Sequence, residues 1–291
     1  MGHRHLATFN RLAEHTDTVT DLAWNKDSSR LTSASLDNTI IIWDTASWQP
    51  LTTLTSPTDE ARYMALNVDG SLIAFSTCGN YDPKSIGNCT RDEILIWDTN
   101  RGQPLKTLAD HTDTVLNSAW NDDGSKLASA SSDRTIIIWD TATWQPQITL
   151  IDHTDTVLDV AWNGDSSRLA STSSDKTIII WDTTTWQPLV TLTDDRSVAE
   201  FVIWNNDGTR LASGSCGKTD GDSNVCIQGE ITIWDTTNRE PLTTLVNHRD
   251  SVNSVTWNAS SDRLASAGAG QQHHYMGHNQ MATTSYTHRP L

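Results

Sequence analysis

The sequence predicts an all-β fold made of about six repeated units, each of four short antiparallel strands. Trp-Asp pairs return along the chain with first-residue spacings of 54, 42, 42 and 53, at Trp43-Asp44, Trp97-Asp98, Trp139-Asp140, Trp181-Asp182 and Trp234-Asp235. A common phrase surrounds each pair, most plainly over residues 153–192. A period near 42 residues indicates one supersecondary unit per repeat.

Residues 153–192 show how one unit is built. Four apolar stretches, separated by turn residues, are expected to form strands: 157–162, 168–173, 177–181 and 188–192. The third stretch, TIIIW, is continuously apolar, as suits a strand that is covered on both faces. Four short strands per unit, with turns every 8–12 residues, are typical of a β-propeller blade. The first strand recurs six times, at 19–24, 61–66, 115–120, 157–162, 199–204 and 252–257.

Composition narrows the classes of function. The 291 residues carry a formal net charge of -16, which disfavours nucleic acid and anionic membrane surfaces as partners. No run of 18 apolar residues predicts a transmembrane helix. The opening MGHRHLATFN lacks the apolar stretch of a secretory signal, so the default expectation is a cytoplasmic location.

In order, spacing and residue types, the units resemble the WD-repeat β-propeller family over residues 5 to 269. The resemblance implies a hydrogen-bonded His, Ser, Asp and Trp tetrad in each regular blade. The matching residues are His15, Ser33, Asp37 and Trp43; His111, Ser129, Asp133 and Trp139; and His153, Ser171, Asp175 and Trp181. A buried indole N–H and a buried hydroxyl need partners, so we assign these residues a structural role. A Ser-His-Asp trio that recurs in several units is not expected to be catalytic. We therefore expect no enzymatic activity, no cofactor and no metal site.

The second and fifth units depart from the pattern together. Phe75 stands where the template has Ser171, and Asp195 stands where it has His153. Each unit carries an insertion, and the insertions are bracketed by the four cysteines of the chain, Cys78 and Cys89 in one and Cys216 and Cys226 in the other. These insertions are three units apart, and Trp43 and Trp181 are 138 residues apart, so the array is interpreted as a duplicated block of three units.

One local disulfide per insertion, Cys78–Cys89 and Cys216–Cys226, is the simplest interpretation, because each pair brackets its own loop. Free thiols in a reducing compartment and a zinc site are the alternatives. Disulfides favour an oxidising compartment, whereas no signal peptide is visible, and the sequence leaves this conflict open.

Three tryptophans mark the turn between the third and fourth strands, in the phrases SWQP and TWQP: Trp48, Trp144 and Trp186. The structural interpretation is that each ring packs on the rim of a blade. The functional alternative is an aromatic platform for a peptide or a sugar, because Trp offers large contact area at low entropic cost.

The sixth unit begins at His248 but has no β-branched third strand and no Trp-Asp pair. We expect a propeller domain over residues 1–269 and a His-rich, disordered tail over 270–291. Residues 5–12 look like a fourth strand without its blade. The last blade is thus predicted to lack its third strand, to fray, and to tend toward self-association, since an unpaired strand edge attracts other chains.

The sequence predicts a non-enzymatic protein-interaction scaffold, with a carbohydrate- or small-ligand-binding lectin as the alternative. In the resembled family the face that bears the second-to-third-strand turns often holds the partner. On that ground we expect a protein or peptide partner at Tyr81, Asp82, Lys84, Lys218, Asp220 and Asp222. Fold analogy carries part of this expectation, and the partner's identity is not in the sequence.

Overall fold

The computed structural model describes residues 14–25, 27–55, 62–81, 89–193, 197–220, 225–237, 240–268 and 273–277. The chain forms two compact units, Met1–Ala109 and Asp110–Leu291. Every regular element among the described residues is a β-strand, and none of these residues is helical. No helix in this part of the chain is long and apolar enough to cross a membrane.

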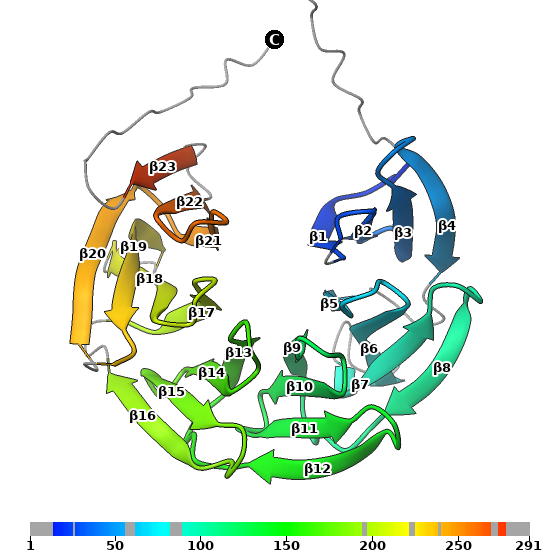
Figure 1. The fold of residues 1–291 in the computed structure, drawn as a ribbon, viewed down its shortest axis with the longest axis horizontal. Coiled ribbons are helices and arrows are strands. Elements are labelled where there is room, and N and C mark those ends of the chain that lie inside the picture. Colours follow the sequence, from blue (N-terminus) through cyan, green and yellow to red (C-terminus); the bar gives the residue numbers. More distant parts are fainter. Residues whose placement is uncertain are drawn as a thin grey trace, which may run out of the picture. The chain divides into compact units, whose positions relative to one another are not determined.

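The first unit contains two four-stranded antiparallel sheets, each a simple meander (Figure 1). Sheet one has the strands β1 (Val19–Trp24), β2 (Arg30–Ser35), β3 (Thr39–Asp44) and β4 (Gln49–Thr55). Sheet two has β5 (Arg62–Leu66), β6 (Leu72–Tyr81), β7 (Cys89–Asp98) and β8 (Gln103–Leu108).

The second unit contains three more four-stranded sheets and one of three strands, which follow one another around an arc with the first strands on its inner side (Figure 1). Sheet three has β9 (Val115–Trp120), β10 (Lys126–Ser131), β11 (Ile136–Asp140) and β12 (Gln145–Leu150). Sheet four has β13 (Val157–Trp162), β14 (Arg168–Ser173), β15 (Thr177–Asp182) and β16 (Pro188–Thr193). Sheet five has β17 (Ala199–Trp204), β18 (Arg210–Thr219), β19 (Cys226–Asp235) and β20 (Glu240–His248), and sheet six has β21 (Val252–Trp257), β22 (Arg263–Gly268) and β23 (His273–Gly277). The expected all-β fold of about six blades, the last incomplete, is confirmed.

The strands form where the sequence alternates or is β-branched, and the turns between them use polar side chains. In sheet four, Asn163 Oδ1 accepts the Arg168 N–H at 2.9 Å and so closes the turn between the first two strands. The third strand is buried on both faces, as its continuous Ile run predicted, with Ile178, Ile179 and Ile180 all buried. Burial of each such side chain contributes about 2 kcal/mol.

Apolar clusters between neighbouring sheets form the core. Within the second unit, one cluster joins sheets three and four, a second joins sheets four and five, and a third joins sheets five and six. Within the first unit, the corresponding cluster joins sheets one and two. Within the second unit, sheets four and five therefore each bury one face against the sheet that precedes them and the other against the sheet that follows.

Asp and Arg side chains add hydrogen bonds across two of these junctions. Asp21 of β1 accepts the Met64 N–H of sheet two at 3.0 Å, and Asp159 of β13 accepts the Val202 N–H of sheet five at 2.7 Å. Arg30 donates to Thr99 of sheet two, and Arg168 donates to Thr236 of sheet five, both at 3.4 Å. The two junctions repeat at the interval of the duplicated three-unit block.

The sixth sheet corrects one expectation. Its third strand is present: β23 pairs antiparallel with β22, from Ala267 opposite His273 to Arg263 opposite Gly277. Backbone pairing does not need β-branched side chains, and it satisfies donors and acceptors along β22 that would otherwise be exposed. A strand therefore lies within the segment that the sequence assigned to a disordered tail. The expected fourth strand, residues 5–12, and residues 278–291 lie outside the described residues.

Candidate functional site

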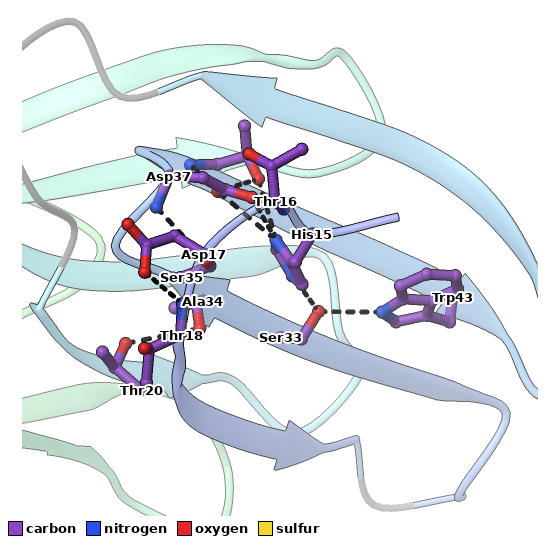
Figure 2. A network of polar contacts seen from close by, with 11 residues as sticks. His15, Thr16, Asp17, Thr18, Thr20, Ser33, Ala34, Ser35, Asp37 and Trp43 are labelled. Carbon is purple, nitrogen blue, oxygen red and sulfur yellow. Dashed lines mark hydrogen bonds and ion pairs between the residues drawn. The ribbon is translucent and has the colours of Figure 1, made fainter. Parts of the chain in front are cut away.

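Sheets one, three and four contain the expected tetrads, each connecting the loop before the first strand to the core, and Figure 2 shows the tetrad of sheet one. In sheet one, Trp43 Nε1–H donates to Ser33 Oγ at 2.9 Å, and Ser33 Oγ lies 2.7 Å from His15 Nε2. The other imidazole nitrogen, Nδ1, lies 3.1 Å from Asp37 Oδ2. In sheets three and four the same three distances are 2.9, 2.8 and 2.8 Å and 2.9, 2.8 and 3.0 Å.

Donor and acceptor roles in the tetrad follow from its two fixed ends. The carboxylate can only accept, so the imidazole Nδ1–H donates to it and Nε2 accepts the Ser hydroxyl proton. The Ser oxygen then accepts the indole N–H. Every polar atom of the chain from Trp181 to Asp175 is satisfied in this way with His153 neutral.

The titration of the tetrad agrees with these roles. Burial lowers the pKa of His153, although the neighbouring Asp175 opposes this shift. The lowered pKa favours the neutral imidazole. Burial by itself would raise the pKa of Asp175, but hydrogen bonds from Thr177, Thr154 and His153 outweigh it and lower the pKa to about 2. The pKa values of Asp37 and Asp133 are also lowered, against burial, by hydrogen bonds that include His15 and His111.

This geometry is suited to holding loops rather than to chemistry. The Ser33, Ser129 and Ser171 side chains are buried, and each hydroxyl already bonds both an indole and an imidazole. A nucleophile needs access to a substrate, which these hydroxyls lack. Among the described residues, no group of three or more His, Cys, Asp or Glu side chains could hold a metal ion.

The remaining sheets keep only parts of the tetrad. In sheet two Phe75 replaces the serine, its ring lies 6.5 Å from that of Trp97, and the Trp97 indole N–H has no partner. Sheet five retains the bond from Trp234 to Ser213 at 2.9 Å, while its Asp195 lies outside the described residues. Sheet six retains His248 and Ser266, 2.7 Å apart.

The insertion of sheet five forms a long hairpin, β18–β19, that is closed by a disulfide. Cys216 and Cys226 are bonded with their Cα atoms 5.7 Å apart, which confirms this predicted pair. Beyond the disulfide, the Asp220 N–H donates to the Val225 carbonyl at 3.0 Å and closes the turn. Asp220 Oδ1 also accepts the Val225 N–H at 3.3 Å. The two strands of the hairpin are therefore cross-linked by the disulfide, and Asp220 and Val225 are hydrogen-bonded to each other.

The hairpin β6–β7 of sheet two has the same backbone register. Tyr81 pairs with Cys89 and Thr219 pairs with Cys226, and in both hairpins the other cysteine lies three residues before the paired one. The Cys78–Cys89 disulfide itself lies outside the described side chains and stays a prediction.

The structure places only part of the expected partner site. Lys218 and Asp220 are exposed at the end of the sheet-five hairpin. Tyr81 is the last residue of β6, and its side chain is not among those described. Asp82, Lys84 and Asp222 lie outside the described residues. The two hairpins belong to different compact units, so each is described by itself, and the shared partner site stays a prediction.

Sequence reasoning missed two apolar residues on this hairpin. Val225 and Ile227, on either side of Cys226, are 54% and 42% exposed. The signal was the presence of Val225 in an insertion otherwise made of Cys, Gly and polar residues, with Ile227 directly after it. Both residues lie beyond the base of the hairpin. At the base, Gly229 of β19 pairs with His248 of β20, and a Cβ on Gly229 would lie 2.4 Å from the Asp250 carbonyl oxygen.

The three WQP tryptophans pack against their own sheets. Their rings meet those of Trp24, Trp120 and Trp162 edge to face, with centroids 5.9 to 6.1 Å apart. Trp186 is only 8% exposed and belongs to the core between sheets three and four. Trp48, Trp144 and Trp186 each adopt a left-handed φ of 55–58°, where sheet two has Gly102. Packing thus holds a bulky residue in a conformation that glycine adopts more readily.

Comparison with known proteins agrees with the fold. The family of the WD domain, G-beta repeat, matches residues 5–44, 102–140, 144–182 and 239–272, together more than half of the chain. The segments that carry the two Cys-bracketed insertions fall outside these matches. The chain belongs to the WD40 repeat family, whose members are generally protein-interaction modules and typically non-catalytic.

Individual relatives are distant and much longer. The chain is 30% identical to Periodic tryptophan protein 2 of Arabidopsis thaliana over 44% of its own length and 13% of the relative's. It is 31% identical to Coronin-7 of Bos taurus over 42% of its length and 13% of the relative's. It is 28% identical to Protein FIZZY-RELATED 3 of Arabidopsis thaliana over 41% of its length and 23% of the relative's. The matched part is thus less than a quarter of each of these relatives.

Proposed function

We propose that this chain is a non-enzymatic scaffold that binds a protein or peptide partner through the hairpin of sheet five. The observation that carries the proposal is the pairing of rigidity with exposed apolar surface: a disulfide and a closed turn hold Val225 and Ile227 in solvent. Pre-organised apolar side chains with a polar rim are typical of binding surfaces, since little entropy is lost on association.

Lys218 and Asp220 supply that rim. Both are exposed, and they carry opposite charges. Rim charges act mainly on partner selection and on the association rate, so these two residues are assigned to specificity and the apolar pair to affinity. The matching hairpin of sheet two, with Tyr81, Asp82 and Lys84, is proposed as a second contact of the same kind, together with Asp222. The Cys216–Cys226 disulfide favours an oxidising compartment for this interaction.

The packing of the WQP tryptophans disfavours the carbohydrate-binding alternative. A sugar platform needs an exposed ring face, and Trp186 is buried while Trp48 packs on Leu31, Ile41 and Trp43.

The proposal is tested by affinity capture from a lysate of the source organism, with quantitative mass spectrometry. The double substitution Val225→Asp and Ile227→Asp should lose bound partners by about tenfold or more, as expected for the loss of a central apolar contact. Leu242→Asp is the matched control, because Leu242 is similarly exposed on β20 of the same sheet. Equal capture by wild type and the hairpin variant would refute the assignment.

A further inference from the structure

Strand β19 of sheet five extends beyond the strand that follows it in the sheet. In sheets one, three and four, the third strand is paired with the fourth from its first residue: Thr39 with Thr55, Ile136 with Leu150, and Thr177 with Thr193. In sheet five, the pairing of β19 with β20 reaches only Gly229, opposite His248. Cys226, Ile227 and Gln228 therefore have β18 on one side and, among the described strands, none on the other.

The chain turns away from this edge directly after His248. A Cβ on Gly229 would lie 2.4 Å from the Asp250 carbonyl oxygen and 2.8 Å from Val252 Cγ2. Gly229 thus allows the connection to β21 to pass close to the base of the hairpin, where a larger residue would collide with it. The insertion carries the backbone of β19 past this point, so that a strand edge projects from the sheet.

The projecting segment has the composition of an edge that can accept another strand. Residues 225–228 contain no charged residue and no proline, the two features by which proteins commonly protect such edges. Ile227 is the extra residue of a bulge opposite Lys218 and Thr219, and bulges often re-aim a side chain beside a functional site. Val225 and Ile227 are the exposed apolar pair already described, and both belong to this edge.

The edge is held in place and continues an apolar contact of the blade. The Cys216–Cys226 disulfide joins β19 to β18 beside the projecting segment. Four residues further along β19 from Ile227, Ile231 packs with Val252 and Val255 of β21. A strand that joins this edge would meet a preformed surface, so that little conformational entropy is lost on binding.

The charge of the chain favours a basic occupant. The formal net charge is -16, which attracts positively charged segments at long range. Around the hairpin itself, Lys218 and Arg249 balance Asp220 and Asp250 in number. The preference for a basic segment therefore comes from the whole chain and should weaken as salt is added.

We propose that an extended, basic peptide segment of the partner pairs with the edge of β19 at residues 226–228. The segment takes the place next to β19 that β20 leaves after His248. Apolar side chains two positions apart in the segment contact Val225 and Ile227. In strand addition of this kind, main-chain hydrogen bonds give affinity and side-chain contacts give selectivity. The proposal rests on the proposed function, because it uses the same hairpin, and it adds the conformation and the charge of the bound segment.

Selection from short random peptides displayed on phage supplies the probe. Peptides are selected on wild type, and those that also bind the double variant Val225→Asp and Ile227→Asp are removed, after thermal melting has shown that the variant is folded. The enriched peptides should be basic and should carry apolar residues two positions apart. A synthetic copy should bind wild type at least about tenfold more tightly than the variant. The absence of enriched peptides, or enrichment of peptides without positive charge, overturns the proposal.

N-methylation of the synthetic peptide separates strand addition from contact through side chains alone. Alternate N–H groups of an extended peptide point to opposite edges. Methylation of one alternate set should weaken binding by about tenfold or more, whereas methylation of the other set should change it by less than about threefold. An equal effect of the two sets would rule out strand addition.

Amide hydrogen exchange tests which edge of the hairpin is used. The bound peptide should slow exchange within residues 226–228 and leave residues 217–219 of β18 unchanged, because only the β19 edge is paired with it. Protection of residues 217–219 alone would contradict the assignment.

Capture of partners from the lysate distinguishes failure of this inference from failure of the proposed function. If the double variant Val225→Asp and Ile227→Asp loses its partners while the peptide results are negative, the hairpin remains the partner site and strand addition is wrong. If capture is unchanged in the double variant, the proposed function fails and this inference fails with it.

Discussion

Sheets four and two show two ways of stabilising the same strand meander. Sheet four has a polar chain inside it, from Trp181 through Ser171 and His153 to Asp175. Sheet two has Phe75 in the place of the serine, packed at 6.5 Å from Trp97, and leaves an indole N–H unpaired. The difference teaches that the tetrad is one solution to filling the blade and that apolar packing is another.

The external ties follow the same division. Asp21 and Arg30 join sheet one to sheet two, and Asp159 and Arg168 join sheet four to sheet five. Both insertion-bearing sheets are therefore hydrogen-bonded to Asp and Arg side chains of the regular sheet that precedes them.

Substitution of Phe75 in sheet two is expected to have the largest effect on stability. Phe75→Ala should destabilise the first unit by about 3–5 kcal/mol, because a fully buried ring leaves a cavity. Phe75→Ser offers the Trp97 N–H a hydroxyl partner, but one hydrogen bond returns only about 1 kcal/mol. Both variants should therefore unfold at lower urea concentration than wild type. If Phe75→Ser were as stable as wild type, the buried ring would contribute no more than the hydrogen bond that a serine makes at this position.

Substitutions in the tetrad of sheet three test how much the tetrad contributes to stability. His111→Ala or Asp133→Ala should lower the free energy of unfolding by about 1–3 kcal/mol, because each leaves a buried polar partner unsatisfied. Partner capture by the folded fraction should be unchanged. Asp110→Ala is the control, since Asp110 is exposed beside His111, and its effect should stay within about 0.5 kcal/mol. Lost binding with an unchanged melting temperature would contradict the structural role.

A further prediction concerns the pH dependence of stability at the junction of sheets four and five. Burial raises the pKa of Asp159 to about 7, against hydrogen bonds from the Val202 and Val160 N–H groups. A raised carboxyl pKa contributes stability that is fully present below its ordinary 3.8 and is lost as pH rises through about 7. The lowered pKa of His153 acts oppositely: its contribution is fully present above the ordinary 6.5 and is lost as pH falls below 6.5 through the lowered value of the folded state.

Asp159→Asn isolates the first of these effects, and Asn117 at the same position of sheet three shows that an amide fits there. Urea unfolding at about pH 4.5 and about pH 8 should show a smaller loss of stability with rising pH in the variant than in wild type. Identical pH dependence in the two proteins would mean that Asp159 does not titrate in this window.

Most of the fold could be predicted because the repeat fixes strand type and order. Trp43 and its equivalents gave the period, the resemblance to the WD-repeat family implied the tetrads, and the local position of the cysteines was enough to assign the Cys216–Cys226 disulfide. Strand β23 was missed because His273–Gly277 lacks β-branched residues and pairs through its backbone. The ties of Asp159 and Arg168 were missed because they join residues more than forty positions apart, and exposure at Val225 depends on where the hairpin ends.

The serial strand order has a consequence for how the chain reaches its native state. Each sheet pairs only consecutive strands, so the contacts are local and any sheet can nucleate early. Sequence segments that are nearly identical and 42 residues apart, however, allow a strand of one sheet to pair wrongly with strands of the next sheet. Strand exchange between repeats is a characteristic error of such arrays. The divergent second and fifth sheets break the run of identical repeats, and so reduce the number of wrong partners during synthesis.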